Sequence, residues 1–242
     1  SQFALDPFVA PSAAQFGVNF NNEAALLGDS DTSNGIIASD TLLGVSFTDV
    51  NVGTTGSNVT DLALGGGYTL TTNFETLLDR EQNVTITGPD GDVAQRLLRD
   101  VHAIGTAAGG ACCNENSFTL SGFASGDEVF VQLFGGEETW SADLDVLVNW
   151  ASVGTWESVA DSNLLTGSSF GFFAQADANG DLLFDFEALA GPTFNAEFAG
   201  ISGLIVSVQA QQAVTEATSI LLWSLLGLVL TGLGYLRNRR KK

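Results

Sequence analysis

Alternating apolar and polar residues form short runs along most of the chain. In the run 127–135, Val129, Val131 and Leu133 lie on one side of the alternation and Gln132 lies on the other. A repeat of two is typical of half-buried β-strands, because successive side chains point to opposite faces of a sheet. Turn-forming residues separate the runs at intervals of roughly 8 to 15 residues. Ten runs are therefore expected to be strands, namely 15–20, 43–52, 67–72, 83–88, 117–123, 127–135, 143–150, 169–176, 181–189 and 201–209.

One segment has helical spacing instead. In residues 92–103, Asp92 is expected to cap the N-terminus of a helix. The apolar side of this helix would comprise Val93, Leu97, Leu98 and Val101. Ten strands and one short helix predict an all-β domain in residues 1–212, an antiparallel β-sandwich of the jelly-roll-like kind.

The C-terminal end of the chain has a different pattern, an unbroken apolar run at 220–236 followed by positive charge. With the three small residues before it, the run reaches about 20 residues, the length that a transmembrane helix needs. Segment 213–219 is then a linker. Positive flanks stay on the cytoplasmic side, so 237–242 is predicted to be a cytoplasmic tail and the main domain to lie outside. The residues expected to set this topology are Arg237, Arg239, Arg240, Lys241 and Lys242.

Small residues recur at helical spacing within the predicted transmembrane helix. They are Ser224, Gly227, Thr231 and Gly234. Such a stripe lets a second membrane helix approach closely and would then be a helix-packing face. It is equally an ordinary feature of membrane-helix composition, so both interpretations stay open.

The part of the chain before residue 217 is strongly acidic. It contains all 28 Asp and Glu residues and only three arginines, which gives a net charge of −25 with neutral His. Nucleic acid is excluded as a partner, because so few cations cannot neutralise its phosphates. Anionic lipid surfaces would also repel this domain, so the predicted helix is what would hold it at the membrane.

The first residue and the cysteines also suggest export. The chain begins at Ser1 and contains no methionine, which we interpret as a mature N-terminus after removal of a signal peptide. An oxidising compartment permits disulfides. Cys112 and Cys113 are adjacent, so they can form a strained vicinal disulfide, bond to another chain or remain thiols.

The order of Glu216, an apolar helix and an arginine cluster at the C-terminus resembles the PEP-CTERM sorting tail of Gram-negative bacteria, which exosortases recognise and process. The preceding domain is similar to the β-sandwich domains often found ahead of such tails. This second resemblance rests on the order of four segments, namely 97–105, 117–136, 176–188 and 199–209.

The tail departs from the family at Thr215 and Ala217, which stand where the family has prolines. Prolines impose an extended segment that a protease can grip, whereas Thr-Glu-Ala can simply extend the helix. We therefore favour a retained anchor over a cleaved tail. The resemblance then implies the Gram-negative inner membrane, with the main domain in the periplasm. A processed tail would instead place the protein at the cell surface or in the extracellular matrix.

The sequence offers little for catalysis. His102 is the single histidine, and it falls within the predicted helix. There is no G-x-S-x-G segment to place a nucleophilic serine, and no pattern of Cys and His residues for zinc. We predict no catalytic residue and no enzymatic activity.

Calcium is the one cofactor for which the sequence gives an indication. Asp177, Asn179 and Asp181 alternate as ligands do in calcium loops, although the distal Glu of an EF-hand is missing. An Asn-Gly hairpin turn explains the same residue types. The acidic segment 28–35 has similarly loose spacing.

Three tryptophans cluster within 140–156 and suggest glycan binding by stacking of sugar rings on exposed aromatic rings. Trp150 closes an alternating run and is expected in the core. Trp140 and Trp156 lie in polar, loop-like contexts and are the predicted stacking residues. Burial of these rings is the alternative.

These observations predict a non-catalytic, membrane-anchored structural or interaction protein of the periplasm or cell surface. One alternative is an accessory single-pass subunit of a larger membrane complex. Another is a carbohydrate-binding surface module that depends on calcium. The expected partners are the membrane and other membrane or surface proteins or further copies of the chain, together with a glycan in the last case and an exosortase-like enzyme if the tail is processed.

Overall fold

The computed structural model covers the whole chain and divides it into two compact units, residues 1–209 and 210–242. The structure describes residues 14–21, 41–51, 58–74, 77–79, 90–98, 100–105, 116–135, 143–157, 169–189 and 198–208. All of these residues belong to the first unit.

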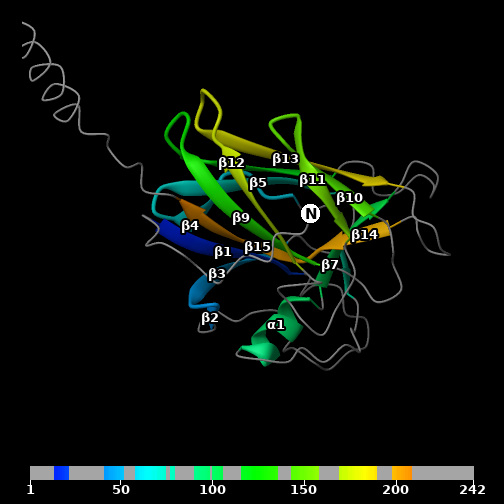
Figure 1. Cartoon of the computed structure of the whole chain (residues 1–242). Helices are drawn as coiled ribbons and strands as arrows, with labels where there is room; N and C mark the ends of the chain where they lie inside the picture. The colour runs from blue at the N-terminus through cyan, green and yellow to red at the C-terminus, as the bar shows by residue number, and fades with distance from the viewer. Residues whose placement is uncertain are drawn as a thin grey trace, which may run out of the picture. The chain divides into compact units, whose positions relative to one another are not determined.

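Two six-stranded sheets form the body of this unit (Figure 1). Sheet 1 has the strand order β12 (Ser169–Gln175), β9 (Glu128–Phe134), β15 (Gly203–Val208), β1 (Ala14–Asn21), β3 (Val45–Asn51) and β2 (Thr41–Leu42). Sheet 2 has the order β11 (Ala151–Glu157), β10 (Asp143–Val148), β13 (Asp181–Leu189), β8 (Asn116–Ser121), β5 (Tyr68–Phe74) and β4 (Leu62–Gly65). A small third sheet contains β14 (Phe198–Ile201), β7 (Asp100–Gly105) and β6 (Leu77–Asp79).

Apolar side chains from sheets 1 and 2 meet in one core, so the prediction of a β-sandwich is confirmed. Phe118 of β8 stacks on Phe184 of β13 with 4.4 Å between ring centroids. Phe20 of β1, on the facing sheet, lies 5.6 Å from Phe118 and 5.0 Å from Phe74 of β5. Aromatic pairs of this kind contribute about 0.5–1.5 kcal/mol beyond the area they bury. These rings therefore help to hold the two sheets together.

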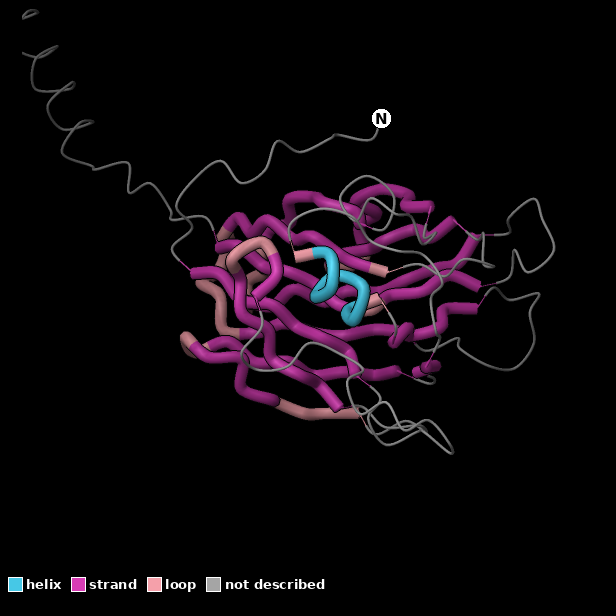
Figure 2. Tube along the Cα trace, turned by 90° about the horizontal axis from the view of Figure 1, so that it is seen from below, coloured by secondary structure: helices cyan, strands magenta, loops and turns pink. Residues whose placement is uncertain are grey.

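A short helix, α1 (Gly91–Leu97), covers part of the outer face of sheet 1, the face turned away from the main core (Figure 2). Leu97 and Leu98 belong to a second apolar cluster with Phe134 and Ile205 of sheet 1. Phe134 points away from the main core and is nevertheless completely buried, because the helix side of this cluster covers it.

The predicted helix 92–103 is too long, and the structure corrects it at both ends. α1 ends at Leu97, and residues 100–105 form β7, which pairs with β14 on one side and with β6 on the other. Val101 continues the apolar period of the helix, but its backbone is paired with Leu78 of β6. Hydrogen bonding to two neighbouring strands therefore outweighs local helical spacing here.

The helix begins differently from the prediction as well. The N-cap residue is Asp90, in a left-handed conformation with φ 59°, and not Asp92. Its carboxylate accepts a hydrogen bond from the Leu43 N–H at 3.1 Å instead of capping the helix. Asp90 thus ties α1 to the turn between β2 and β3.

Nine of the ten predicted strands coincide with strands of the structure, and the tenth, 83–88, lies outside the described residues. The prediction of a wholly antiparallel sandwich is wrong at one pair, since β1 runs parallel to β3. Parallel neighbours need a long connection between them. Residues 22–44, which contain β2, provide it.

No helix in the described ranges is long and apolar enough to cross a bilayer; the one present, α1, has seven residues. The predicted transmembrane helix 220–236, its stripe of small residues, the basic residues after it and Glu216 all lie outside the described residues. Cys112 and Cys113 lie outside them too.

Candidate functional site

The outer face of sheet 2 is acidic. Asp145 of β10 lies opposite Glu187 of β13, and Asp143 lies opposite Glu157 of β11. The Ser152 hydroxyl donates to Asp145 Oδ1 at 2.6 Å. Like charges directly opposite one another destabilise a sheet. Because water and counterions reduce this repulsion, the carboxylates are more favourable on a face that stays in contact with solvent than on one that is covered.

The outer face of sheet 1 is nearly uncharged. Strands β12, β9, β15 and β1 together contain a single charged residue, Glu128. One row of register neighbours across these four strands consists of Phe173, Phe130, Ser207 and Gln15. The Gln15 amide donates to the buried Ser207 hydroxyl at 2.9 Å. This face thus presents aromatic rings and an amide where sheet 2 presents carboxylates.

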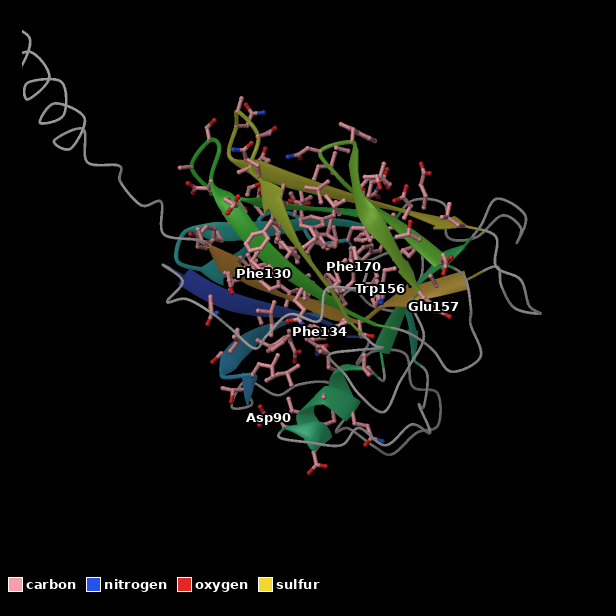
Figure 3. All side chains as sticks on the ribbon, in the orientation of Figure 1. Asp90, Phe130, Phe134, Trp156, Glu157 and Phe170 are labelled. Carbon is pink, nitrogen blue, oxygen red and sulfur yellow. The ribbon has the colours of Figure 1, made fainter. Side chains whose placement is uncertain are left out.

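Two phenylalanines of this row lie side by side at the edge of sheet 1. Phe173 belongs to the edge strand β12 and is 54% exposed. Its ring centroid is 5.2 Å from that of half-buried Phe130 on β9, with 57° between the ring planes. Figure 3 shows Phe130 and Phe134 along β9. Because α1 covers Phe134 but not this pair, Phe173 keeps a ring face in contact with solvent.

A tryptophan projects from the neighbouring turn between β10 and β11. Asn149 and Trp150 form this two-residue turn, and both have positive φ, 50° and 68°. Turns of this kind favour Asn at the first position and Gly at the second, since a Cβ atom is crowded in the left-handed conformation. Trp150 adopts it nevertheless and is 73% exposed, more than Phe173 or Leu189, the other exposed large apolar residues of the described chain.

Asn149 fixes the turn through both ends of its side-chain amide. The Nδ2 group donates to the Gln175 carbonyl at 3.2 Å and to the Asp181 carbonyl at 3.3 Å. Oδ1 accepts the Leu183 N–H at 2.9 Å. The backbone N–H of Asn149 also donates to the Leu183 carbonyl at 2.8 Å. The turn that carries Trp150 is therefore tied to both β12 and β13.

These contacts place the two most exposed aromatic residues in one region. Gln175, whose carbonyl accepts from Asn149, lies two residues after Phe173 on the same face of β12, a rise of about 7 Å along the strand. We call the set Phe130, Asn149, Trp150, Phe173 and Gln175 the aromatic corner.

The structure reverses the predicted roles of two tryptophans. Trp150, expected in the core, is exposed, and Trp156, expected on the surface, is 2% exposed. Trp156 stacks on Phe170 with 6.3 Å between centroids and 10° between planes (Figure 3). It points inward because it neighbours Leu144 of β10 in the register, a residue of the main core. Within the described part of the chain its Nε1 has no hydrogen-bond partner. Trp140 lies outside the described residues.

The aromatic corner was only half visible in the sequence. The alternation of 127–135 and 169–176 places Phe130 and Phe173 on the outer face of their strands. The signal for the turn was Asn149, a residue that tolerates positive φ, between two runs of strand type. The predicted strand 143–150 included Asn149 and Trp150, so the turn that these two residues form was not predicted.

The predicted calcium loop is a tight turn between β12 and β13. Asp177 Oδ1 accepts the N–H groups of Asn179 at 2.7 Å and Asp181 at 3.0 Å. Hydrogen bonds from these backbone groups hold the pKa of Asp177 below its ordinary value. Among the described residues no three His, Cys, Asp or Glu side chains are grouped as metal ligands. The loop geometry agrees with the hairpin interpretation, and the segment 28–35 lies outside the described residues.

The environment of Tyr68, on β5, disfavours its ionised form. Burial, and then the charge of Asp127, raise the pKa of Tyr68 above its ordinary value. Its ring packs between Phe16 and Phe123, with centroid distances of 5.1 and 4.9 Å. His102, the single histidine, lies in β7 and not in a helix, with its backbone paired to Ile201 and Leu77.

No known protein family and no curated protein matches the chain. Solved structures with a similar course of the chain include the ANX2 ectodomain from Arabidopsis thaliana, with 11% identity and a TM-score of 0.49 over 81% of this chain. The plant receptor-like kinase FER has 14% identity and a TM-score of 0.48 over 81%. A calcium-binding mutant of Bacteroides uniformis β-glucuronidase 2 has 9% identity and a TM-score of 0.47 over 82% of this chain. This chain spans 50% of each plant chain and 18% of the glucuronidase chain.

Proposed function

We propose that the chain is a non-catalytic interaction protein of the periplasm or cell surface, in which a jelly-roll-like sandwich is anchored to the membrane by residues 220–236. The observation that carries the proposal is the aromatic corner. Trp150 and Phe173 are the most exposed large apolar residues described, and a hydrogen bond from Asn149 to Gln175 links the turn of Trp150 to the strand of Phe173, at the edge of a nearly uncharged face of an otherwise acidic protein. Clustered exposed aromatic residues mark interaction sites, whereas isolated ones are ordinary.

Photocrosslinking in intact cells tests this proposal without assuming the chemistry of the partner. p-Benzoylphenylalanine, which reacts with C–H bonds, replaces Phe173 in the full chain. The matched control carries it in place of Leu189, which is 41% exposed on the outer face of sheet 2. We expect a crosslinked species of higher mass at position 173 and little at position 189. Absence of a product at position 173, or equal products at both positions, contradicts the proposal.

A second function, an accessory subunit of a membrane complex, is favoured by a different observation. Ser224, Gly227, Thr231 and Gly234 share one side of the predicted transmembrane helix, where small residues allow close packing of a second helix. Gentle detergent extraction and native mass measurement separate the two functions. A heteromeric particle that dissociates on Gly227→Leu but persists on Phe173→Ala would favour the subunit function.

A further inference from the structure

We infer that the aromatic corner binds an uncharged polysaccharide, with Trp150 and Phe173 stacking on the apolar faces of sugar rings. The inference rests on the proposed function, because it names the ligand class of the same surface. It differs from the glycan site predicted from sequence, since Trp156 is in the core and Trp150 takes its place at the surface.

The first argument is the way in which Trp150 is presented. The left-handed conformation is sterically unfavourable for a non-glycine residue, because its Cβ atom is crowded there. At 73% exposure the side chain offsets little of this cost by packing. The hydrogen bonds of Asn149 hold the turn in this conformation. An unfavourable backbone conformation that the surroundings impose on an exposed aromatic residue indicates a binding role. A ring on a fixed turn also loses little freedom when a ligand binds.

The second argument is the polar setting of the two exposed rings. Gln175 lies two residues after Phe173 on the same face of β12 and donates one amide hydrogen to the Gly126 carbonyl at 3.1 Å. A side-chain amide has two hydrogens and an acceptor oxygen, so this exposed group retains capacity for sugar hydroxyls. Gln15, also exposed, offers a second amide at the far side of the row. Sugar hydroxyls both donate and accept, and therefore suit amides better than they suit a purely apolar patch.

The third argument is size. The row from Phe173 to Gln15 crosses four neighbouring strands, which corresponds to about 14 Å at 4.7–4.9 Å per strand. Exposed Phe173 and Gln15 stand at the two ends of this row, with buried Ser207 between them. A ligand that contacts both ends must therefore be longer than a monosaccharide, so a polymer is the better match.

The fourth argument is charge. Asp177 and Asp181 belong to the turn that adjoins the corner, and the whole chain has a net charge of −20. Acidic polysaccharides, anionic lipids and a second copy of the chain are therefore repelled. Asp177 and Asp127 are engaged within their own turns, since Asp177 accepts two backbone N–H groups and Asp127 accepts the Ala124 N–H at 2.9 Å. Glu128 of β9 lies opposite Gln175, is exposed, and is the one charged residue of the four strands. A cationic partner thus finds a single exposed carboxylate on this face, whereas an uncharged ligand needs none.

Native affinity electrophoresis of the full chain tests the ligand class, since the acidic protein migrates without added dye. The protein is kept in a polyoxyethylene detergent, because a glycoside detergent would compete. The gels contain hydroxyethyl cellulose, dextran or galactomannan as uncharged probes and alginate as the anionic probe. We expect at least one uncharged probe to retard the protein and alginate to have no effect. Raising the salt concentration should leave the retardation unchanged, because no charge pairs are involved.

Matched variants assign the binding to the corner. Phe173→Ala and Trp150→Ala should each raise the dissociation constant obtained from the retardation about tenfold, as truncation of a residue that dominates an interface does. Leu189→Ala, which truncates the third exposed large apolar residue of the described chain on the outer face of sheet 2, should leave it unchanged. Trp150→Gly removes the ring while keeping the turn geometry, so it separates lost stacking from a misfolded turn.

The remaining outcomes overturn the inference. They are retardation by alginate alone, retardation that Trp150→Gly and Phe173→Ala leave intact, or no retardation by any uncharged probe. If no probe binds but position 173 still crosslinks to a protease-sensitive partner, the ligand is a protein and the proposed function survives. If position 173 crosslinks to nothing as well, the proposed function fails with it.

Discussion

At the scale of single residues, Asn149 and Trp150 show how a binding feature depends on backbone conformation. Asn is a residue type that tolerates positive φ, and the Asn149 side-chain amide makes three hydrogen bonds that stabilise this conformation of the turn. Trp150 follows it into the left-handed region without an advantage of its own. The exposed position of the Trp150 ring therefore follows from the hydrogen bonds of Asn149 and not from the conformational preference of Trp150.

Glycine should therefore be the more stable residue at position 150. Trp150→Gly and Trp150→Ala both remove the ring, but only glycine adopts φ 68° without steric cost. We expect the free energy of unfolding of Trp150→Gly to exceed that of Trp150→Ala by about 1 kcal/mol. Urea denaturation of the full chain in detergent measures the difference. Equal stability of the two variants would mean that the turn does not hold position 150 in the left-handed region.

At the scale of elements, alternation was a sufficient signal wherever a strand is long and has one buried face. It missed β2, β4, β6 and β14, which have two to four residues and are too short to show a period. It missed the seven-residue strand β11 (Ala151–Glu157) as well, because its residues do not alternate between buried and exposed positions. It also missed β7, where helical spacing and strand pairing compete for the same residues and the partners β6 and β14 are distant in sequence. Pairing with distant strands is a property of the whole fold, which no local pattern contains.

The same limit applied to the aromatic corner. The outward position of Phe130 and Phe173 follows from alternation alone. The link between the turn of Trp150 and the strand of Phe173 is a hydrogen bond between Asn149 and Gln175, which are 26 residues apart in the chain. Alternation therefore implies the outward position of the two phenylalanines, although neither was predicted to bind a ligand, and Trp150 was predicted to lie in the core.

The hairpin of β12 and β13 should respond to pH through Asp177. Backbone N–H groups of Asn179 and Asp181 favour its ionised form, so its folded pKa lies below the ordinary value of 3.8. The stability that it contributes is complete above pH 3.8 and is lost as the pH falls through the folded pKa. Asp177→Asn should thus lower the melting temperature by a few degrees at pH 7, because its neutral amide accepts these hydrogen bonds more weakly.

The difference in melting temperature between wild type and Asp177→Asn should stay constant from pH 7 down to about pH 3.8 and shrink as the pH is lowered further, since Asp177 is then protonated first in the unfolded chain and, below its folded pKa, in the hairpin as well. Thermal melts across this range measure it. Asn179→Ala is the comparison variant, because it keeps the backbone donors and the carboxylate and removes only the side-chain hydrogen bond from Asn179 Nδ2 to Asp177 Oδ2 at 3.4 Å. A difference that stays constant across the range would show that the charge of Asp177 has no part in holding the hairpin.

At the scale of the whole molecule, the sandwich separates two kinds of surface. Carboxylates gather on the outer face of sheet 2, while β12, β9, β15 and β1 present one charged residue among them. The acidic face contributes to solubility and repels anions and other copies of the chain. The uncharged face can then be specific for ligands without charge. The division has a cost, which is the repulsion between carboxylates that lie opposite one another on sheet 2.

That repulsion predicts a stabilising substitution far from the proposed site. Glu187 lies opposite Asp145 in the register of β13 and β10 and is exposed. Glu187→Gln removes the repulsion, and Glu187→Lys replaces it with attraction, each step contributing about 0.2–1 kcal/mol. The free energy of unfolding should therefore rise from wild type to Glu187→Gln to Glu187→Lys at low salt. The differences should diminish at 1 M salt, where the Debye length falls to about 3 Å.

Neither substitution should change the retardation by uncharged polysaccharides, because Glu187 belongs to the opposite outer face. If Glu187→Lys stabilised the protein but also abolished binding, the acidic face would be part of the binding surface, and the separation of the two faces would be wrong. If neither variant were more stable than wild type, counterions would already compensate the carboxylates. In that case the charge of sheet 2 would carry no energetic cost for the fold, and only its effect on the choice of ligand would remain.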